Sequence, residues 1–321
     1  LSSSSAASDV YKRQTCSRIP KAWACAMPSE ILLPIGELAR RTGVNPVTLR
    51  AWERRYGLLK PQRTAKGHRL YPLEQVERVE AILAWLQRGA SVSQVRELLD
   101  KPASTPPKGD WQARQFQLIE AIATLSQRAL DQQLNQAMAL YPAVTLCEQL
   151  LLPLLDLLDL RWRSYFNARL EQVFFHSWLR SKLGARVYHD NQLLQGPVIL
   201  LAEDSEHTFS PGLWLCAWLF TSNGVPVEVL EHTIGGAHLQ RAVTMLKPRA
   251  VLLHLGPRLD DKVLQRLPVP TLAGGPMLAL HEARLRALRL PNLELFDTPQ
   301  AALRLLQAHG RQPGEMTAPC T

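Results

Sequence analysis

The sequence predicts a mixed fold with three parts: a small, mainly helical head, a helical bundle and a C-terminal α/β domain. Basic residues and helix-start signals are concentrated in residues 31–101. Residues 110–190 show helical spacing without strand punctuation, and from Gly196 onward short apolar runs alternate with helical segments. The chain has 321 residues, which is long enough for two or three domains because single cores rarely grow beyond about 250 residues.

The net charge of +9 is concentrated in one part of the chain. Residues 31–101 hold 13 Lys and Arg against 7 Asp and Glu, and the nine basic residues from Arg40 to Arg69 accompany a single acid, Glu53. A charge run is often only a solvated surface, but this one is interleaved with helix and turn signals. It therefore indicates that one small domain has an anionic partner.

Two short helices joined by a glycine turn are predicted inside this basic stretch. Residues 35–41 have helical spacing, and Gly43 gives the following turn its backbone freedom. Asn45 and Pro46 then supply an N-cap and a first-turn proline for a second helix. Such a pair forms a helix-turn-helix, whose second helix can enter the major groove of DNA.

The second helix is predicted to have one apolar and one polar face. Leu49, Trp52 and Tyr56 form the apolar face, and for both aromatic residues a core position is favoured over base stacking. The opposite face is predicted to hold polar and charged residues: Thr48, Arg50, Glu53, Arg54 and Arg55. The arginines could pair with Glu37 or Glu53, but contact with DNA is the favoured interpretation.

The sequence of residues 57–100 predicts a wing and two more helices. Residues 57–71 have two short extended arms around residues 65–67, and their cations could reach phosphates that flank the groove. An apolar face every three to four residues from Val76 to Leu86 predicts a helix, and Ser91 with Gln94 forms a capping box that opens another. Residues 31–101 are thus predicted to be an all-α winged helix-turn-helix head.

Residues 33–100 resemble the DNA-binding domain of the MerR family of transcription regulators. The motifs that carry the resemblance are Ile35-Gly36-Glu37-Leu38-Ala39, the run from Val47 to Leu59, Pro61-Gln62-Arg63, and Gly67-His68-Arg69-Leu70-Tyr71. Residues 45–63 are similar to the MlrA-like branch, which controls curli and biofilm genes. The resemblance implies DNA contacts by residues of the second helix and of the wing: Thr48, Arg50, Arg54, Arg55, Arg63, His68 and Arg69.

The same resemblance implies how the protein acts. It implies binding to double-stranded promoter DNA between promoter elements that are spaced too far apart. A homodimer is expected because one module offers too few contacts and helix-turn-helix proteins read paired half-sites. Family members distort the DNA so that RNA polymerase engages both elements, which predicts an activator. Bending of this kind costs about 1–6 kcal/mol, which the extra protein–DNA contacts offset.

Other classes of protein are disfavoured by the sequence. The longest apolar runs fall far short of a membrane span. The five cysteines are scattered and form no CxxC pair, which predicts a reduced, cytoplasmic location and no metal centre. No GxGxxG, P-loop, HExxH or GxSxG motif is present, so no enzyme is expected, and a corrinoid-dependent enzyme domain is the remaining alternative.

The two ends and one connecting segment are expected to lie outside the folded domains. Residues 1–30 are interpreted as a non-native or disordered leader, with Met27 as the suspected start. The Pro-rich residues 102–109 predict a linker, and residues 311–321 predict a tail.

The two C-terminal domains are predicted at residues 110–190 and 196–310. The first reads as a bundle of about four helices. In the second, five βα units predict a doubly wound parallel sheet of flavodoxin-like type. Ligands in such folds bind beyond the carboxyl ends of the strands, which places residues 203–210 and 254–257 at the candidate rim.

The order of head, bundle and flavodoxin-like domain resembles the cobalamin-binding, light-sensing MerR regulators. Their corrinoid signature, Asp-x-His-x-x-Gly, corresponds to residues 205–210, where His207 is kept as the candidate cobalt ligand but the orienting Asp and the Gly are serines. Their bundle signature, Trp and then Glu-His, is reduced to Trp162 with Glu171-Gln172, and His254 stands where a small Ser is expected. We therefore expect no cofactor. A cobalamin-dependent light- or ligand-sensing repressor is the alternative.

Overall fold

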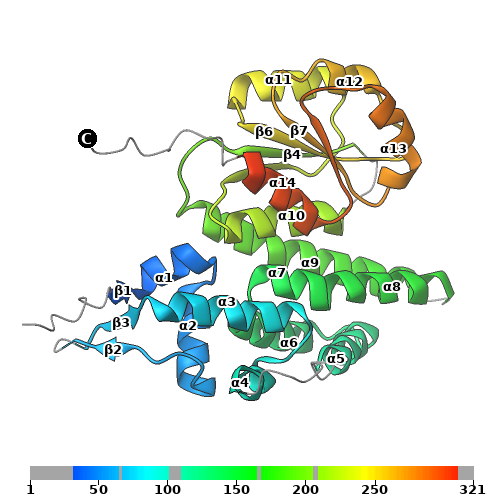
Figure 1. Cartoon of the computed structure of the whole chain (residues 1–321). Coiled ribbons are helices and arrows are strands. Elements are labelled where there is room, and N and C mark those ends of the chain that lie inside the picture. Colours follow the sequence, from blue (N-terminus) through cyan, green and yellow to red (C-terminus); the bar gives the residue numbers. More distant parts are fainter. Residues whose placement is uncertain (1–31, 65–66, 101–109, 165–167, 205–208, 310–321) are drawn as a thin grey trace, which may run out of the picture.

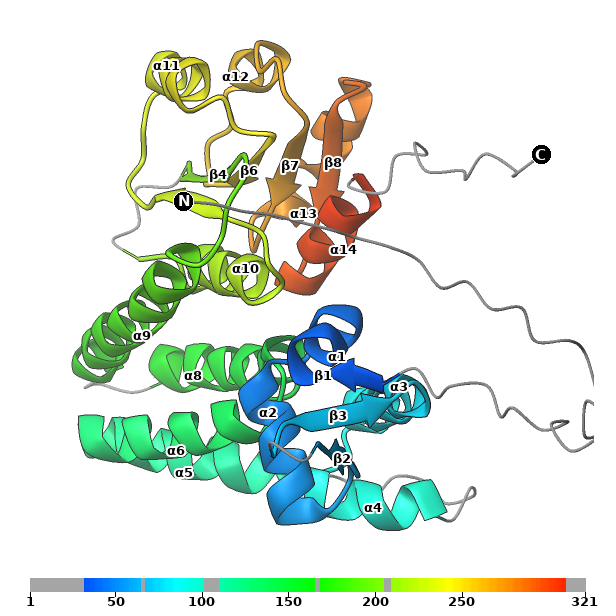
Figure 2. The ribbon, with the colours of Figure 1, turned by 90° about the vertical axis from the view of Figure 1, so that its left-hand side faces the viewer.

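The computed structural model describes residues 32–64, 67–100, 110–164, 168–204 and 209–309. It confirms the predicted fold class, with a helix-turn-helix head, a helical bundle and a five-stranded α/β sheet packed together (Figures 1 and 2). The predicted leader, linker and tail lie outside the described residues.

The helix-turn-helix is formed by α1 (Ile35–Thr42) and α2 (Pro46–Ala51), and α2 continues into the π-helical turn η1 (Trp52–Tyr56). Gly43 ends α1 with φ of 70°, a left-handed conformation that glycine adopts without steric cost. Asn45 caps α2 as predicted, since its side chain accepts a hydrogen bond of 2.8 Å from the backbone N–H of Val47.

The wing belongs to a three-stranded antiparallel sheet with the order β1-β3-β2. Its strands are β1 (Leu32–Pro34), β2 (Gln62–Arg63) and β3 (Arg69–Pro72). The β2–β3 arms confirm the predicted hairpin, but β1 is an additional strand that the sequence does not predict. Three residues are too few to show strand alternation, and β1 forms because Leu33 pairs with Tyr71 of the central strand.

The remaining head helices are α3 (Glu74–Gln87) and α4 (Val92–Asp100). The predicted cap of α4 is present, because the side chain of Gln94 accepts a hydrogen bond of 3.0 Å from the backbone N–H of Ser91. The bundle consists of α5 (Trp111–Ala123), α6 (Gln127–Leu140), α7 (Ala143–Leu146), η2 (Cys147–Leu151), α8 (Leu152–Ser164) and α9 (Ala168–Asn191). Because α7, η2 and α8 follow one another without a break, they count as one long helix. The bundle therefore has four helices, in agreement with the predicted number of about four.

The α/β domain is a parallel sheet with the order β5-β4-β6-β7-β8. Its strands are β4 (Ile199–Glu203), β5 (Val227–Leu230), β6 (Ala250–His254), β7 (Thr271–Gly274) and β8 (Leu293–Phe296). Its helices are α10 (Pro211–Ser222), α11 (Gly236–Leu246), α12 (Asp261–Gln265), α13 (Leu278–Ala287) and α14 (Pro299–His309). Helices α10 and α14 cover the face toward the bundle and α11 to α13 the other (Figure 1), so the strand order reverses between β4 and β6.

One apolar core joins the head, the bundle and the near face of the α/β domain. Trp52 of the head, Phe175 of the bundle and Phe220 of α10 all belong to it and are at most 1% exposed. The head therefore packs against the rest of the chain through buried apolar surface. Within the described ranges, no helix is both long and apolar enough to cross a bilayer.

Candidate DNA interface

The second helix of the head presents a row of exposed arginines. Leu49 and Trp52 are fully buried, which leaves Arg50, Arg54 and Arg55 on the exposed part of α2 and η1. In the described part of the chain, no hydrogen bond or ion pair joins Arg50 or Arg54 to another residue, so the alternative pairing with Glu37 or Glu53 is not formed. These guanidinium groups are free to meet phosphates or base edges.

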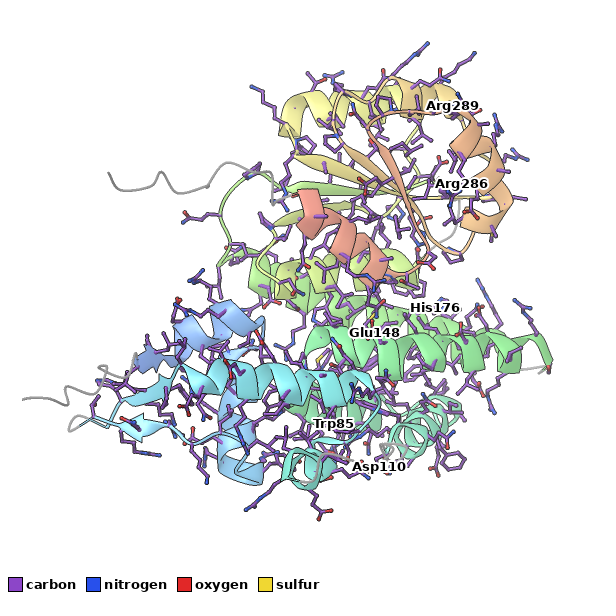
Figure 3. The ribbon with its side chains drawn as sticks, in the orientation of Figure 1. Trp85, Asp110, Glu148, His176, Arg286 and Arg289 are labelled. Atoms are coloured by element: carbon purple, nitrogen blue, oxygen red, sulfur yellow. The ribbon has the colours of Figure 1, made fainter. Side chains whose placement is uncertain are left out.

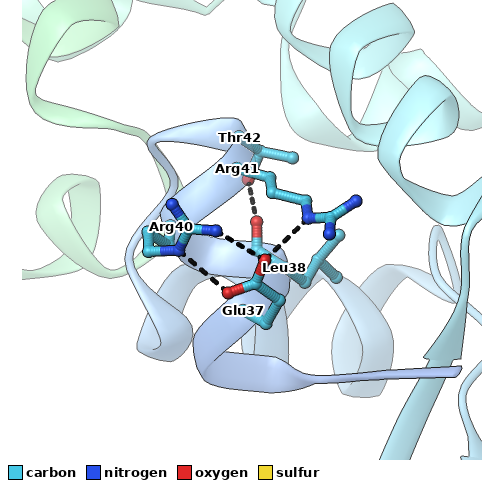
Figure 4. A network of polar contacts seen from close by, with 5 residues as sticks. All are labelled: Glu37, Leu38, Arg40, Arg41 and Thr42. Atoms are coloured by element: carbon cyan, nitrogen blue, oxygen red, sulfur yellow. Dashed lines mark hydrogen bonds and ion pairs between the residues drawn. The ribbon is translucent and has the colours of Figure 1, made fainter. Parts of the chain in front are cut away.

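Glu37 has other partners, which Figure 4 shows. Its carboxylate accepts two hydrogen bonds from Arg40, at 2.9 and 2.7 Å, and one from Arg41 at 2.7 Å. The hydrogen bonds from Arg40 and Arg41 lower the pKa of Glu37 to about 2. The two arginines of α1 are therefore held on their own helix, while those of α2 are not.

Glu53 connects the second helix to the wing. Its carboxylate accepts a hydrogen bond of 2.7 Å from Arg69 Nε and lies 3.7 Å from Arg63 Nη2. The hydroxyl of Tyr71 donates to the same carboxylate at 3.4 Å, and burial, followed by the charge of Glu53, raises the pKa of Tyr71 to about 12. Glu53 therefore fixes the angle between the helix and the wing.

The three predicted wing residues differ in how available they are. Arg63 and His68 are exposed, and the backbone N–H of His68 is held at 3.1 Å by the hydroxyl of Thr64. The side chain of Arg69 is only 25% exposed and is bonded to Glu53. Arg63 and His68 are therefore open to solvent, although Arg63 also lies within ion-pair distance of Glu53, whereas Arg69 is held between the wing and η1.

Thr48 is buried, in contrast to the exposed position that its sequence predicts. The sequence predicts Thr48 on the exposed polar face, but in the structure the residue is 2% exposed. The physical reason is helical spacing: Thr48 precedes the buried Trp52 by four residues, so both share the face that packs against α6. The expectation of an exposed Thr48 is wrong for this arrangement of the head and the bundle.

Two contributors to the interface were missed. Glu53, the only acid in the basic run, is expected only as a possible partner of the arginines of its own helix, whereas in the structure it bonds Arg69 of the wing. Val47 is 58% exposed and lies three and seven residues before Arg50 and Arg54, which puts the three on one face. An apolar side chain at this position can contact a thymine methyl group. The spacing of three and seven residues to Arg50 and Arg54 is the sequence signal that could have identified Val47.

The second candidate site is the rim of the α/β sheet, where β4 and β6 end. His254 is 4% exposed, and its Nδ1 lies 3.0 Å from the hydroxyl of Ser210 and 3.3 Å from a carboxylate oxygen of Glu203. Burial, reinforced by Glu203 and Asp260, raises the pKa of the neighbouring Asp204 to about 6. The imidazole of His254 thus has polar partners inside the fold.

The ring of His254 and the carboxylate of Glu171 both have close neighbours within the fold. The ring of His254 fills the space above two glycines, since a Cβ on Gly275 would clash with its Nε2 and one on Gly212 would lie 2.8 Å from it. In the bundle, Glu171 is held by Arg161 through two hydrogen bonds of 2.8 Å and by Trp162 Nε1 at 3.3 Å. These side chains bond to one another, and the predicted cobalt ligand, His207, lies outside the described residues.

An aromatic cluster joins the bundle to the α/β domain. The imidazole of His176, on α9 in Figure 3, lies 5.5 Å from the ring of Trp162 and 5.2 Å from that of Phe209. Burial lowers the pKa of His176 to about 4. At neutral pH the ring is therefore an uncharged part of the packing.

With His176 replaced by leucine, the free energy of unfolding is expected to fall less in mild acid than it does in the wild type. Between about pH 6.5 and 4 the unfolded chain takes up a proton that the folded His176 does not, so the stability of the wild type falls as the pH falls. Because His176 is partly exposed, we expect it to lower the free energy of unfolding of the wild type by about 1 kcal/mol between pH 7.5 and 5.0. Urea unfolding at both pH values measures this difference, and His189→Leu, on the exposed side of α9, is the control. If the unfolding free energy changed equally with pH in the wild type, His176→Leu and His189→Leu, the prediction would be contradicted.

A helix-turn-helix with an antiparallel wing and free arginines on its second helix defines a DNA-binding protein. The comparisons with known proteins agree. Residues 33–101 match the model of the MerR HTH family regulatory proteins. The HTH-type transcriptional regulator MlrA of Salmonella typhimurium is 33% identical over 205 residues, which cover 63% of this chain and 81% of that relative. The HTH-type transcriptional repressor CarA of Myxococcus xanthus is 28% identical over 255 residues, 76% of this chain and 86% of CarA.

The chain belongs to the MerR family of transcriptional regulators, and it is homologous to MlrA. Among solved structures, the methanol:cobalamin methyltransferase complex MtaBC from Methanosarcina barkeri covers 67% of this chain and 88% of the matched one. Its sequence identity is 13% and its TM-score is 0.31, a likeness too slight to transfer any chemistry.

Proposed function

We propose that this regulator reads promoter DNA through Arg50, Arg54 and Arg55, with Arg63 and His68 of the wing on the flanking backbone. The observation that carries the proposal is the exposed arginine row, whose members Arg50 and Arg54 have no acidic partner among the described residues. Arg69 supports the wing through its bond to Glu53. Base contacts by the helix supply specificity, and the wing supplies affinity.

The wider action is proposed to be that of a homodimer. One module of this size offers few base contacts, and helix-turn-helix proteins commonly bind paired half-sites. A dimer that bends the DNA between two promoter elements would let RNA polymerase engage both, which makes activation the first candidate. The relative CarA is named a repressor, so repression is the second. Either action requires access to the chromosome, which supports a cytoplasmic location.

The α/β domain is proposed to act in regulation and assembly, without an enzymatic reaction and without cobalamin. The filled space at His254 and the internal bonding of Glu171 support this. The alternative, a corrinoid-dependent sensor, would require the ring of His254 to move away from Gly212 and Gly275.

DNA binding can be tested by selection from random duplexes, which requires no known operator. The full chain would select duplexes from a random pool, and a gel-shift titration at several salt concentrations would follow. We expect one enriched sequence with two related half-sites, and an affinity that falls steeply as salt rises because phosphate contacts release counterions. Equal affinity for selected and unselected duplexes would contradict sequence-specific binding.

Cobalamin is expected not to stay on the protein. The full chain, produced with cobalamin in excess and passed through gel filtration, should show no corrinoid absorbance in the protein peak. A His254→Ser variant removes the ring that fills the space and serves as the comparison. Corrinoid retained by the wild type would contradict the proposal, whereas retention by the variant alone would identify His254 as the block.

A further inference from the structure

A cavity of about 440 Å³ lies where the three parts of the chain meet. The turn before α2 and the start of α2 form one wall, the end of α6 and the start of α7 form another, and the ends of α9 and α10 close it. Figures 1 and 2 both show α1 and α2 against the bundle and beneath α10. The volume is that of a small-molecule site and is too small for a folded partner.

The walls combine an apolar surface with a few polar groups. Met138, Leu194 and Trp218 supply apolar area, and Asn135 and Asn223 supply amide groups. This composition, with apolar walls and few polar groups, is typical of pockets that hold an organic ligand in one orientation.

The charged groups of the lining are Arg186 and Asp190, four residues apart on α9. Within the described ranges, no hydrogen bond or ion pair occupies the guanidinium of Arg186, and the residue is exposed. Asp190 is partly buried, and burial raises its pKa. The charge of Arg186 acts on Asp190 and opposes the effect of burial on that pKa. Among the described residues, the site thus offers a guanidinium without a hydrogen-bond partner beside one carboxyl group.

We propose that this cavity binds a small organic acid with an aromatic or other apolar body and one N–H or O–H donor. Its acidic group pairs with Arg186, its donor meets Asp190, and its apolar body packs between Met138, Leu194 and Trp218. An arginine is suited to this task because its planar fork binds carboxylate, sulfonate or phosphate oxygens in pairs.

Occupancy of the cavity would act on the DNA-binding helix. The lining includes Asn45, which caps α2, Thr48, which is buried on its packed face, and Val47, which lies on the exposed face with Arg50. A ligand that touches all three parts stabilises the docked head, in which Arg50 and Arg54 remain exposed. This part of the inference rests on the proposed DNA-binding function, and it predicts that the ligand tightens DNA binding.

The proposal that the cavity binds an organic acid is tested with 8-anilinonaphthalene-1-sulfonate, a fluorescent dye. This dye carries a sulfonate, an aromatic body and an N–H group. Titration of the full chain should show one saturable fluorescent site. Arg186→Ala should weaken it roughly tenfold or more, because a hydrogen-bonded charge pair is lost, and Ser222→Trp should fill the cavity and abolish it. Arg241→Ala, on the remote α11, is the matched control and should bind as the wild type does. Absence of a saturable site, or equal binding by all four proteins, would overturn the proposal.

The proposal that an occupied cavity tightens DNA binding is tested by gel shift on a selected duplex with and without saturating dye. We expect the wild type to bind the duplex at least about fivefold more tightly with dye, and Ser222→Trp to be indifferent to it. An unchanged affinity in the wild type would overturn the regulatory role. If the chain bound no DNA at all, the proposed function would fail, while the dye titration would still decide whether the cavity is a site.

Discussion

Arg54→Ala is expected to weaken binding to the selected operator by about 1–3 kcal/mol, or about 5- to 150-fold. Arg54 is exposed on η1, on the face that it shares with Val47 and Arg50, and forms no hydrogen bond or ion pair among the described residues. Its removal therefore leaves no buried charge behind, and the full loss is a loss of contact with DNA. Arg50→Ala, one turn earlier, should have an effect of the same size.

A gel-shift titration at fixed salt measures this loss, and two comparisons interpret it. Arg241→Ala removes the same charge from the remote α11 and should leave the affinity within about twofold, since distant surface charges are screened. Arg63→Ala, in the wing, should weaken binding to all duplexes about equally and reduce the salt dependence. If Arg54→Ala bound as the wild type does, the interface would lie elsewhere on the head.

Local chemistry made much of the head and the sheet predictable. Asn45 followed by Pro46 can begin a helix but cannot continue one, and Gln94 placed three residues after Ser91 meets its backbone N–H in any helix of that register. The strands of the α/β domain are short apolar runs that only a sheet covered on both faces can bury. Such features depend on neighbours within a few residues, which the sequence displays directly.

Features that depend on distant neighbours could not be predicted in the same way. The bond between Glu53 and Arg69 spans 16 residues and needs the wing to fold back onto η1. The burial of Thr48 and the position of the cavity depend on α6, which begins 79 residues after Thr48 in the chain. Helical spacing alone could have placed Thr48 with Trp52, but nothing in the spacing shows that a second helix covers that face.

Trp52→Phe is expected to lower the free energy of unfolding by about 1–3 kcal/mol. The indole Nε1–H donates a hydrogen bond of 2.8 Å to the backbone carbonyl of Leu140, the last residue of α6, and both groups are buried. Phenylalanine keeps most of the apolar contact but leaves that carbonyl without its donor. Trp52→Ala adds a cavity, so its loss should reach about 3–5 kcal/mol. Urea unfolding of the full chain measures both.

Trp85→Phe is the matched control for this prediction. Trp85 lies on α3 of the same head (Figure 3), is partly buried, and has the guanidinium of Arg88 5.0 Å from its ring, a contact that phenylalanine retains. Its replacement should change the unfolding free energy by less than about 0.5 kcal/mol. Because the bond of Trp52 crosses from the head to the bundle, a larger loss for Trp52→Phe means that the head is docked on the bundle in solution. Equal losses for the two variants would mean that the head moves independently of the bundle, and a ligand in the cavity between them could then not influence α2.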